Sequence, residues 1–336
     1  MLTSELDYDL PEALIAQRPA EPRDSSRLMV VDAAKGTIEH RVFRELPGLL
    51  RPGDVLVLNE TKVLPARLRA RKPTGGEVEL LFLGDLGPDR DGAWEVLARP
   101  SKRLRTDLVL SAGGTGVRLV EDLGNGYWAV AAPDVPALLE RHGRMPLPPY
   151  IEETPEAEAR YQTVYAREPG SAAAPTAGFH FTEAVLDGVE RSGAKTARVT
   201  LHVGTGTFLP VRTERLDEHE MHAERYSVPE GAANVVGEAR RVVAAGTTVA
   251  RTLETWAATG ERSGESRLFV YPGYRWRAVD VLITNFHLPR STLLAMVMSF
   301  GGRDLVREAY RVAVEERYRF YSFGDAMLIL NGGRSP

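Results

Sequence analysis

The sequence has no cysteine among its 336 residues. This absence excludes a disulfide framework, a thiolate zinc or iron–sulfur site and a catalytic thiol. A long apolar run is also missing: the most apolar stretch, residues 288–300, is interrupted by Pro289 and Arg290 and is too short to span a bilayer. The N-terminus lacks the basic start and apolar core of a secretory signal. We therefore expect a cytoplasmic protein with no membrane partner.

An excess of charge of one sign is missing as well. The formal net charge is −4, with 42 Lys and Arg against 46 Asp and Glu. A nucleic-acid partner would therefore need a local basic patch rather than a basic surface overall. Hydrophobic residues make up 43% and charged residues 26% of the chain, as in ordinary globular proteins. The length predicts two domains.

The middle of the chain has the pattern of a small all-β domain. Between residues 77 and 130, short segments alternate apolar and polar residues, and glycine-rich turns separate them at 113–114 and 124–126. The Gly-Asn-Gly turn is typical of a β-hairpin. No convincing helix occurs in this window, which predicts a barrel or a sandwich.

The C-terminal half alternates strands and helices instead. We expect strands at residues 197–203, 268–271 and 279–283, and helices at 182–191, 232–245, 292–299 and 304–317. This alternation is typical of an α/β domain with a largely parallel sheet.

Two N-terminal runs, residues 28–32 and 54–58, also read as strands. If they join the C-terminal sheet, residues 1–66 and 155–336 form a discontinuous α/β domain, and an all-β barrel at 67–154 is inserted into it. Fusion of separate N-terminal and C-terminal domains is the alternative.

Polar strings follow three of the predicted strands, at residues 202–208, 271–274 and 284–287. In a parallel sheet the carboxyl ends of the strands gather along one edge, where ligands bind. We therefore expect the turns that carry His202 and His287 to share one pocket.

Four of the seven histidines fall between residues 180 and 222, and a histidine cluster can move protons near neutral pH. His219, His222 and Glu224 also suggest a two-histidine, one-carboxylate metal site, which we rank below a metal-free site. Gly204 and Gly206 lack the third glycine of a dinucleotide fingerprint and the lysine of a P-loop, but they allow close approach of a ligand to the backbone.

Basic side chains gather in two clusters of the β region, where they would contact phosphates or simply cover a solvated strand face. The clusters are Arg67, Arg69, Arg71 and Lys72, and then Arg99, Lys102, Arg103 and Arg105.

A series of specific strings runs along almost the whole chain: residues 23–28, 59–68, 145–151, 161–165, 170–181, 200–211, 221–224, 246–254, 271–273, 284–294 and 318–329. Together they resemble one family, the S-adenosylmethionine:tRNA ribosyltransferase-isomerases of queuosine biosynthesis. The resemblance implies an α/β domain interrupted by a β-barrel, and we expect a monomer. It also implies that the ribosyl part of S-adenosylmethionine, a cosubstrate, moves to 7-aminomethyl-7-deazaguanine at the tRNA wobble position, without a metal. The product is epoxyqueuosine, and adenine and methionine are released.

The sulfonium of this cosubstrate acidifies the neighbouring C5′ protons, so the reaction needs a positioned base, and a proton for the departing adenine. We take His180, His202, His222 and His287 as candidates for proton transfer. The expected cosubstrate-binding residues are Gly204, Gly206, Arg251, Glu254, Tyr271, Thr284 and Asn285, with Arg251 and Glu254 at the polar ends of methionine. The expected tRNA-binding residues are Arg67, Arg69, Arg99, Lys102 and Arg103.

Four positions depart from the family pattern: Val249 in place of serine, Glu60 in place of Asp or Asn, Phe179 in place of Leu, and Ala223 in place of Ser. A related transferase that acts on a free 7-deazapurine is therefore a second hypothesis. A non-catalytic RNA-binding protein and a metal-dependent hydrolase or oxygenase are the third and fourth.

Overall fold

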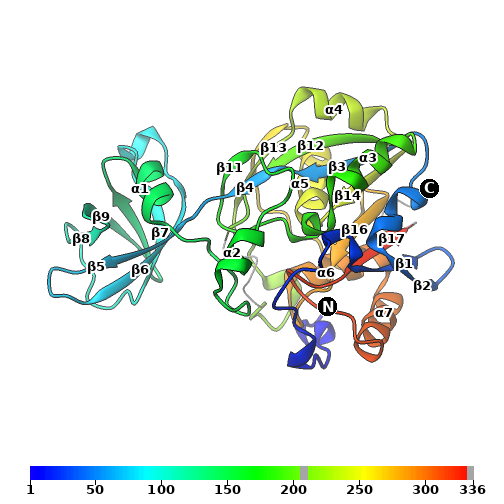
Figure 1. Ribbon diagram of the computed structural model, residues 1–336, viewed down its shortest axis with the longest axis horizontal. Helices are drawn as coiled ribbons and strands as arrows, with labels where there is room; N and C mark the ends of the chain where they lie inside the picture. The colour runs from blue at the N-terminus through cyan, green and yellow to red at the C-terminus, as the bar shows by residue number, and fades with distance from the viewer. Residues whose placement is uncertain (205–210, 331–336) are drawn as a thin grey trace.

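A mixed sheet forms the centre of the larger body in the computed structural model, which describes residues 1–204 and 211–330 (Figure 1). Its nine strands lie in this spatial order: β15 (Ser263–Ser266), β13 (Glu224–Ser227), β12 (Lys195–Leu201), β3 (Asp54–Asn59), β14 (Arg241–Ala245), β16 (Val281–Asn285), β17 (Ala326–Leu330), β1 (Arg27–Asp32) and β2 (Thr37–Val42).

The centre of this sheet is parallel and its edges are antiparallel. Strands β12, β3, β14 and β16 run parallel to one another, and β17 is parallel to β1. Strand β17 is antiparallel to β16, and both sheet edges pair antiparallel. Strands β1 and β3 lie inside the sheet, so the prediction that the N-terminal strands join the C-terminal ones is confirmed.

Both faces of the sheet are buried, which explains why its central strands are continuous apolar runs rather than alternating ones. In β3, Val55 and Val57 face a core that includes Val249 of α5 (Thr247–Thr259). Leu56 and Leu58 face the opposite core, with Val185 of α3 (Glu183–Arg191). Helices α4 (Glu230–Gly237), α6 (Thr292–Gly301) and α7 (Arg303–Glu315) contribute to the first core.

A closed six-stranded barrel forms a separate lobe (Figure 1). Its strands are β5 (Arg67–Arg71), β6 (Glu77–Asp85), β7 (Trp94–Arg99), β8 (Val109–Ala112), β9 (Thr115–Gly124) and β10 (Tyr127–Ala131). Apolar residues of α1 (Val135–His142) pack into the barrel core. The sequence predicted this barrel.

The chain leaves the body and returns to it side by side. Strand β4 (Thr61–Val63) precedes the barrel, and β11 (Glu168–Ser171), which pairs parallel with β4, follows it after α2 (Pro155–Arg160). Arg67 fastens the two connections together: its backbone exchanges hydrogen bonds of 3.1 and 2.8 Å with Arg144. Its guanidinium binds the Leu147 carbonyl and Glu153.

Two predicted elements are wrong. The helix expected at residues 232–245 is instead α4 followed by β14, because the apolar run after Arg241 is buried as a parallel strand. The strand expected at 268–271 is irregular backbone that follows β15. Helix α5 and strand β17 were not predicted. Within residues 1–204 and 211–330, no helix combines the length and apolar character needed to cross a membrane.

Candidate active site

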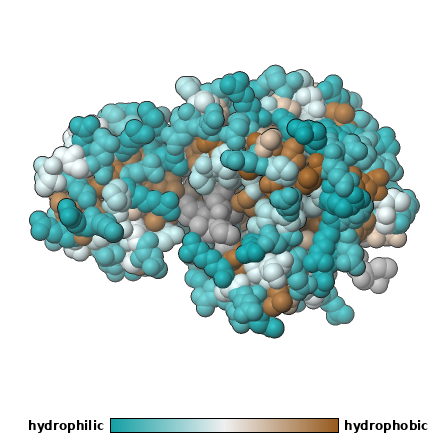
Figure 2. Space-filling model, turned by 90° about the horizontal axis from the view of Figure 1, so that it is seen from below, coloured by the Kyte–Doolittle hydropathy of each residue, from teal (hydrophilic) through white to brown (hydrophobic). Residues whose placement is uncertain are grey.

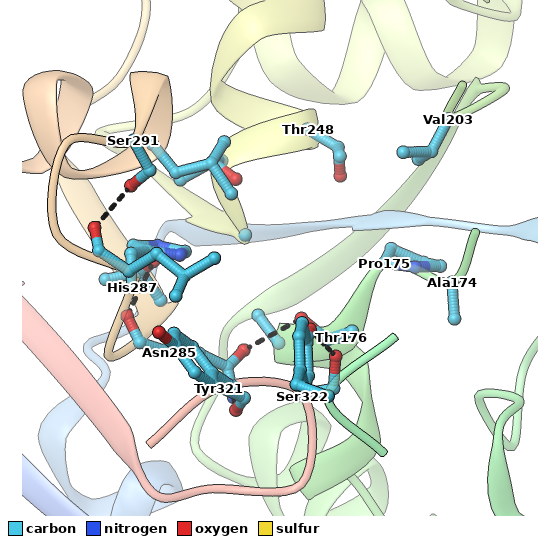
Figure 3. A pocket seen from close by; sticks show the side chains of 17 residues that line it. Ala174, Pro175, Thr176, Val203, Thr248, Asn285, His287, Ser291, Tyr321 and Ser322 are labelled. Carbon is cyan, nitrogen blue, oxygen red and sulfur yellow. Dashed lines mark hydrogen bonds between the residues drawn. The ribbon is translucent and has the colours of Figure 1, made fainter. Parts of the chain in front are cut away.

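A pocket of about 650 Å³, including its open mouth, lies where the central strands end (Figure 3). Val203 follows β12, Gly246 follows β14, and Asn285 ends β16. The segment before β17 adds Tyr321 and Ser322, because this strand runs in the opposite direction. The pocket therefore occupies the position that an α/β sheet offers to a ligand, at the carboxyl ends of its parallel strands.

Helix α5 begins at the pocket. Gly246, its N-cap residue, has a φ of 106°, and its N–H donates to the Ile283 carbonyl at 2.8 Å. No side chain caps the helix, and Thr247 and Thr248 of its first turn line the pocket. The first N–H groups of a helix lack internal partners and carry a partial positive charge. This end of α5 therefore offers the pocket hydrogen-bond donors that suit oxygen atoms of a ligand.

Asn285 lies at the inner wall and is 2% exposed. Its Nδ2 lies 3.2 Å from the Tyr321 carbonyl and 3.1 Å from Nε2 of His180, and its Oδ1 accepts from the Thr176 hydroxyl at 3.3 Å. His180 itself does not line the pocket: it stands behind Asn285, stacked on Phe43. The structure thus separates His180 from the ligand by one side chain.

His287 lines the pocket directly. Its Nε2 lies 2.6 Å from the Thr284 hydroxyl, while its backbone N–H donates to the Tyr310 hydroxyl and its carbonyl accepts from Tyr8. Burial lowers the pKa of His287 to about 3, so the imidazole is neutral at physiological pH. Its Nδ1 bonds no described residue, and it is therefore available to a ligand.

A second, smaller pocket of about 330 Å³ adjoins the first, and Thr247, Thr248 and Leu293 line both. Arg251 lies on its wall, 6% exposed, and forms an ion pair of 2.9 Å with Glu224. Burial lowers the pKa of Arg251, and the carboxylate of Glu224 opposes that shift. Apolar side chains, including those of Met221, Phe269 and Met296, complete the wall.

Arg251 keeps one nitrogen uncommitted. Its Nε and Nη2 bond Ser266, and Nη2 also reaches the His222 carbonyl and Glu224. No bond from Nη1 to a described residue exists. The N–H groups of Nη1 can donate to a carboxylate of a ligand.

Of the sequence-predicted residues, the structure brings Thr284, Asn285 and His287 to the first pocket and Arg251 to the second. His202 shares the turn that lines the first pocket through Val203, but its own side chain lies on the other side, 2.9 Å from the Thr61 hydroxyl and against Gly170. Successive side chains of a strand point to opposite faces, which explains this difference.

Three other predicted residues, His222, Tyr271 and Gly204, line neither pocket. His222 is exposed. Burial raises the pKa of Glu95 on barrel strand β7, and His222 lies close enough to oppose that increase. The Tyr271 ring packs against Phe269. The Gly204 N–H donates to Glu224 at 2.8 Å, and Gly206 lies outside the described residues.

Glu254 is bonded within the protein rather than exposed to a pocket. Its carboxylate accepts hydrogen bonds from the Tyr274 hydroxyl and from the backbone N–H groups of Arg277, Ala278 and Val279, at 2.8–3.1 Å, and the residue is fully buried. It therefore fastens the loop before β16 to α5, and we do not carry it into the proposed site.

The structure does not bring the side chains of His219, His222 and Glu224 together as metal ligands. The His219 ring packs against Phe269, and Glu224 is paired with Arg251. Within the described ranges, no group of three His, Cys, Asp or Glu side chains is placed to hold a metal ion. The metal-dependent hypothesis gains no support from this part of the chain.

The basic residues of the barrel differ in availability. Arg67 is committed to Glu153 and to the connection with the body. Arg69 and Arg99 are exposed and flank Glu79 on adjacent strands, in the register Arg69–Glu79–Arg99. Lys102 and Arg103 are exposed in the turn after β7. In the space-filling view, the barrel surface is mostly hydrophilic (Figure 2).

Sequence reasoning missed several residues of the first pocket: Tyr150, Thr176, Tyr321 and Ser322. All four lie in strings that carried the family resemblance, but none has ionisable chemistry near neutral pH. The Tyr150 hydroxyl bonds Ser322 at 2.7 Å, and its ring packs against Tyr321 at 4.7 Å between centroids. Their position became evident only from the fold, which brings residue 150 beside residue 322.

These features define a class: an α/β enzyme with a two-part ligand pocket at a sheet edge and an inserted β-barrel. A family profile described as "Queuosine biosynthesis protein" matches residues 3–329. The S-adenosylmethionine:tRNA ribosyltransferase-isomerase of Rubrobacter xylanophilus is 73% identical over 100% of this chain and 99% of its own length. The protein of that name from Moorella thermoacetica is 53% identical over 98% of this chain and 100% of its own length.

A solved structure is also similar. The crystal structure of the S-adenosylmethionine tRNA ribosyltransferase from Thermotoga maritima matches with a TM-score of 0.57 and 39% identity, covering 97% of this chain and 100% of that one. This chain belongs to the S-adenosylmethionine:tRNA ribosyltransferase-isomerase family of queuosine biosynthesis proteins and is a transferase and isomerase.

Proposed function

We propose that this enzyme transfers and isomerises the ribosyl part of S-adenosylmethionine onto 7-aminomethyl-7-deazaguanine at the wobble position of a tRNA. The product is epoxyqueuosine, and adenine and methionine are released. The names of the relatives supply the cosubstrate and the tRNA. The observation that carries the proposal is the joined pair of pockets, with neutral polar groups in the larger and a buried arginine in the smaller.

The two pockets suit the two ends of S-adenosylmethionine. The larger pocket, lined by polar side chains and by the start of α5, takes the nucleoside. The smaller takes the methionine end: its apolar wall suits the methylene carbons, and Nη1 of Arg251 suits the carboxylate.

His287 is the proposed base. It is the one predicted proton-transfer histidine whose side chain lines the pocket within the described residues, and its Nδ1 is open to a ligand. The sulfonium makes the C5′ protons acidic, and a neutral imidazole accepts one of them. Adenine leaves C1′ with the electron pair of its glycosidic bond and takes up the proton that His287 removed from C5′. The Thr248 hydroxyl also lines the pocket and can stabilise developing charge.

The tRNA acceptor is supported by the barrel. The exposed Arg69 and Arg99, together with Lys102 and Arg103, form a basic surface on a lobe beside the body (Figure 1). Such a surface suits the phosphates of an RNA.

The departures from the family pattern give no support to a different acceptor. Val249 is fully buried in the core under the sheet, Phe179 lies in a separate apolar cluster, and the Glu60 carboxylate lies near Arg198. None of these three, nor Ala223, lines either pocket. The proposal therefore keeps the tRNA acceptor rather than a free 7-deazapurine.

Adenine release from S-adenosylmethionine tests the proposal. The enzyme is incubated with tRNA that carries the aminomethyl base, with the free base, and with neither, and adenine is measured by chromatography. We expect release only with the modified tRNA. Release with the free base would favour a small-molecule acceptor, and tRNA binding without any release would favour a non-catalytic RNA-binding protein.

A further inference from the structure

The orientation of the Asn285 amide follows from its neighbours. A backbone carbonyl only accepts hydrogen bonds, so the atom of Asn285 that faces the Tyr321 carbonyl at 3.2 Å is the nitrogen, Nδ2. The other end, Oδ1, faces the Thr176 hydroxyl. The amide therefore has one orientation consistent with both contacts.

This orientation fixes the tautomer of His180. The second hydrogen of Nδ2 points to Nε2 of His180 at 3.1 Å, so Nε2 accepts and the proton of the neutral ring is on Nδ1. That Nδ1–H donates to the Ser26 hydroxyl oxygen at 2.8 Å. Both ring nitrogens are therefore used, and neither is left for a substrate.

The surroundings keep His180 neutral. The residue is 3% exposed, its ring stacks on Phe43, and the guanidinium groups of Arg23 and Arg319 lie near enough to oppose a further positive charge. Burial, with these two cations, lowers the pKa of His180 to about 3. Across the physiological range the ring remains a hydrogen-bond acceptor toward Asn285.

These hydrogen bonds also determine which groups Asn285 and Thr176 present to the pocket. The single hydroxyl proton of Thr176 is directed to Oδ1 of Asn285, so the remaining capacity of both oxygens is acceptor capacity. Both residues line the first pocket, where Figure 3 shows them on the same side as Tyr321. Asn285 and Thr176 therefore present acceptors to the pocket and no free side-chain donor.

We propose that His180 is a positioning residue that locks Asn285 with its carbonyl oxygen toward the pocket, and that Asn285 and Thr176 select a substrate group that donates an N–H or O–H. The inference rests on the proposed function for its ligand, because the nucleoside of S-adenosylmethionine carries such donors on the adenine amine and on the ribose hydroxyls. A carbonyl in place of that donor would face two oxygens and be rejected.

Binding of analogues tests this selection. Isothermal titration calorimetry compares S-adenosylmethionine with its 6-oxo, 2′-deoxy and 3′-deoxy analogues on the wild-type enzyme. We expect the analogue that lacks the recognised donor to bind at least about ten-fold more weakly, since a buried acceptor is left unpaired. The analogue affected identifies the donor. Equal affinity of all three analogues and S-adenosylmethionine would overturn the inference.

Variants of His180 test the positioning role. His180→Phe keeps a ring on Phe43 but removes the acceptor, and we expect discrimination between S-adenosylmethionine and the affected analogue to fall to about three-fold or less. His180→Gln places a carbonyl oxygen near the position of Nε2 and should restore discrimination. Because the ratio is measured within one variant, a change in stability does not imitate the effect. Unchanged discrimination in His180→Phe would contradict the proposal.

A pH profile separates positioning from proton transfer. The rate of single-turnover adenine release is measured between pH 5 and 8 for wild type and for His180→Gln. Any inflection that wild type shows in this range should also be present in His180→Gln. An inflection that disappears in His180→Gln would make His180 an acid or base and overturn the proposal. Failure of wild type to bind S-adenosylmethionine or to release adenine would instead overturn the proposed function.

Discussion

His180 and His287 flank the end of β16, and both are neutral because burial lowers their pKa values to about 3. Their contacts distinguish them. Both nitrogens of His180 are bonded within the protein, whereas one nitrogen of His287 faces the pocket. Residue type and spacing do not reveal this difference, since it depends on which neighbours the fold supplies.

Substitution of His287 tests its assignment as the base. We expect His287→Gln to lower the single-turnover rate of adenine release by about 100-fold or more, because general base catalysis contributes that much. His202→Gln is the matched control, since Val203 beside it lines the pocket but the His202 side chain does not, and it should retain the rate within about three-fold. A larger loss in His202→Gln than in His287→Gln would contradict the assignment.

The buried neutral histidines also predict an acid-sensitive stability. Their pKa is 6.5 in the unfolded chain and about 3 in the folded one, so stability present above pH 6.5 is lost as the pH falls toward 3. Each such histidine accounts for about 1.4 kcal/mol per pH unit in this range. Urea unfolding at several pH values should give His180→Gln a slope shallower than wild type by this amount. Identical slopes would show that His180 is not buried as a neutral ring.

Element prediction succeeded where a segment has one clear signal. Thr182 begins α3, and its hydroxyl accepts from the Val185 N–H. It failed at residues 232–245, because Gly237 was not read as the end of a helix and the short run after Arg241 fits either a buried helix or a buried strand. Only pairing with β3 and β16 decides the second case.

Helix α5 was missed because it is rich in threonine, which has low helix propensity. In the structure, Thr252, Thr255 and Thr259 each donate a hydroxyl hydrogen bond to the carbonyl four residues earlier. This satisfies the hydroxyls within the helix. Val249, Ala250 and Leu253 of the same helix are buried in the core, a tertiary contact that a single sequence does not display.

The attachment of α5 to the loop before β16 gives a prediction about Glu254. Glu254→Gln replaces a carboxylate oxygen that accepts backbone hydrogen bonds with a donor, and should lower the free energy of unfolding by about 2–3 kcal/mol. Adenine release well below the unfolding temperature should stay within about two-fold of wild type. Glu261→Gln, an exposed position just beyond the same helix, should change neither property. Loss of activity without loss of stability would indicate that Glu254 binds substrate and would contradict its structural role.

At the scale of the molecule, the two lobes were predictable because their sequence periods differ. The convergence of residues 150, 176, 285 and 322 on one pocket was not. Their approach depends on strand order, which places β17 antiparallel beside β16 and brings the segment before it to the pocket.

The barrel surface predicts a salt-dependent interaction with tRNA. Arg69→Ala and Arg99→Ala should each weaken tRNA binding and reduce the slope of log affinity against log salt by about 1, because each removes one phosphate contact. Arg118→Ala, on β9 and paired with Asp107, is the control and should leave the slope unchanged. Filter binding at several salt concentrations measures the affinity for tRNA and this slope. A change in Arg118→Ala equal to that in Arg69→Ala would indicate general charge rather than this surface.

The position of β17 has a consequence for how the chain matures on the ribosome. Strand β17 joins β1 to β16, and the Arg27 N–H donates to Asp325, 298 positions later. The barrel strands pair within a continuous segment and complete their contacts early in translation, but β1 waits for almost the last part of the chain to be synthesised. Nascent chains therefore carry a finished barrel on an unclosed sheet with open strand edges, which is the stage most exposed to aggregation and to chaperone capture.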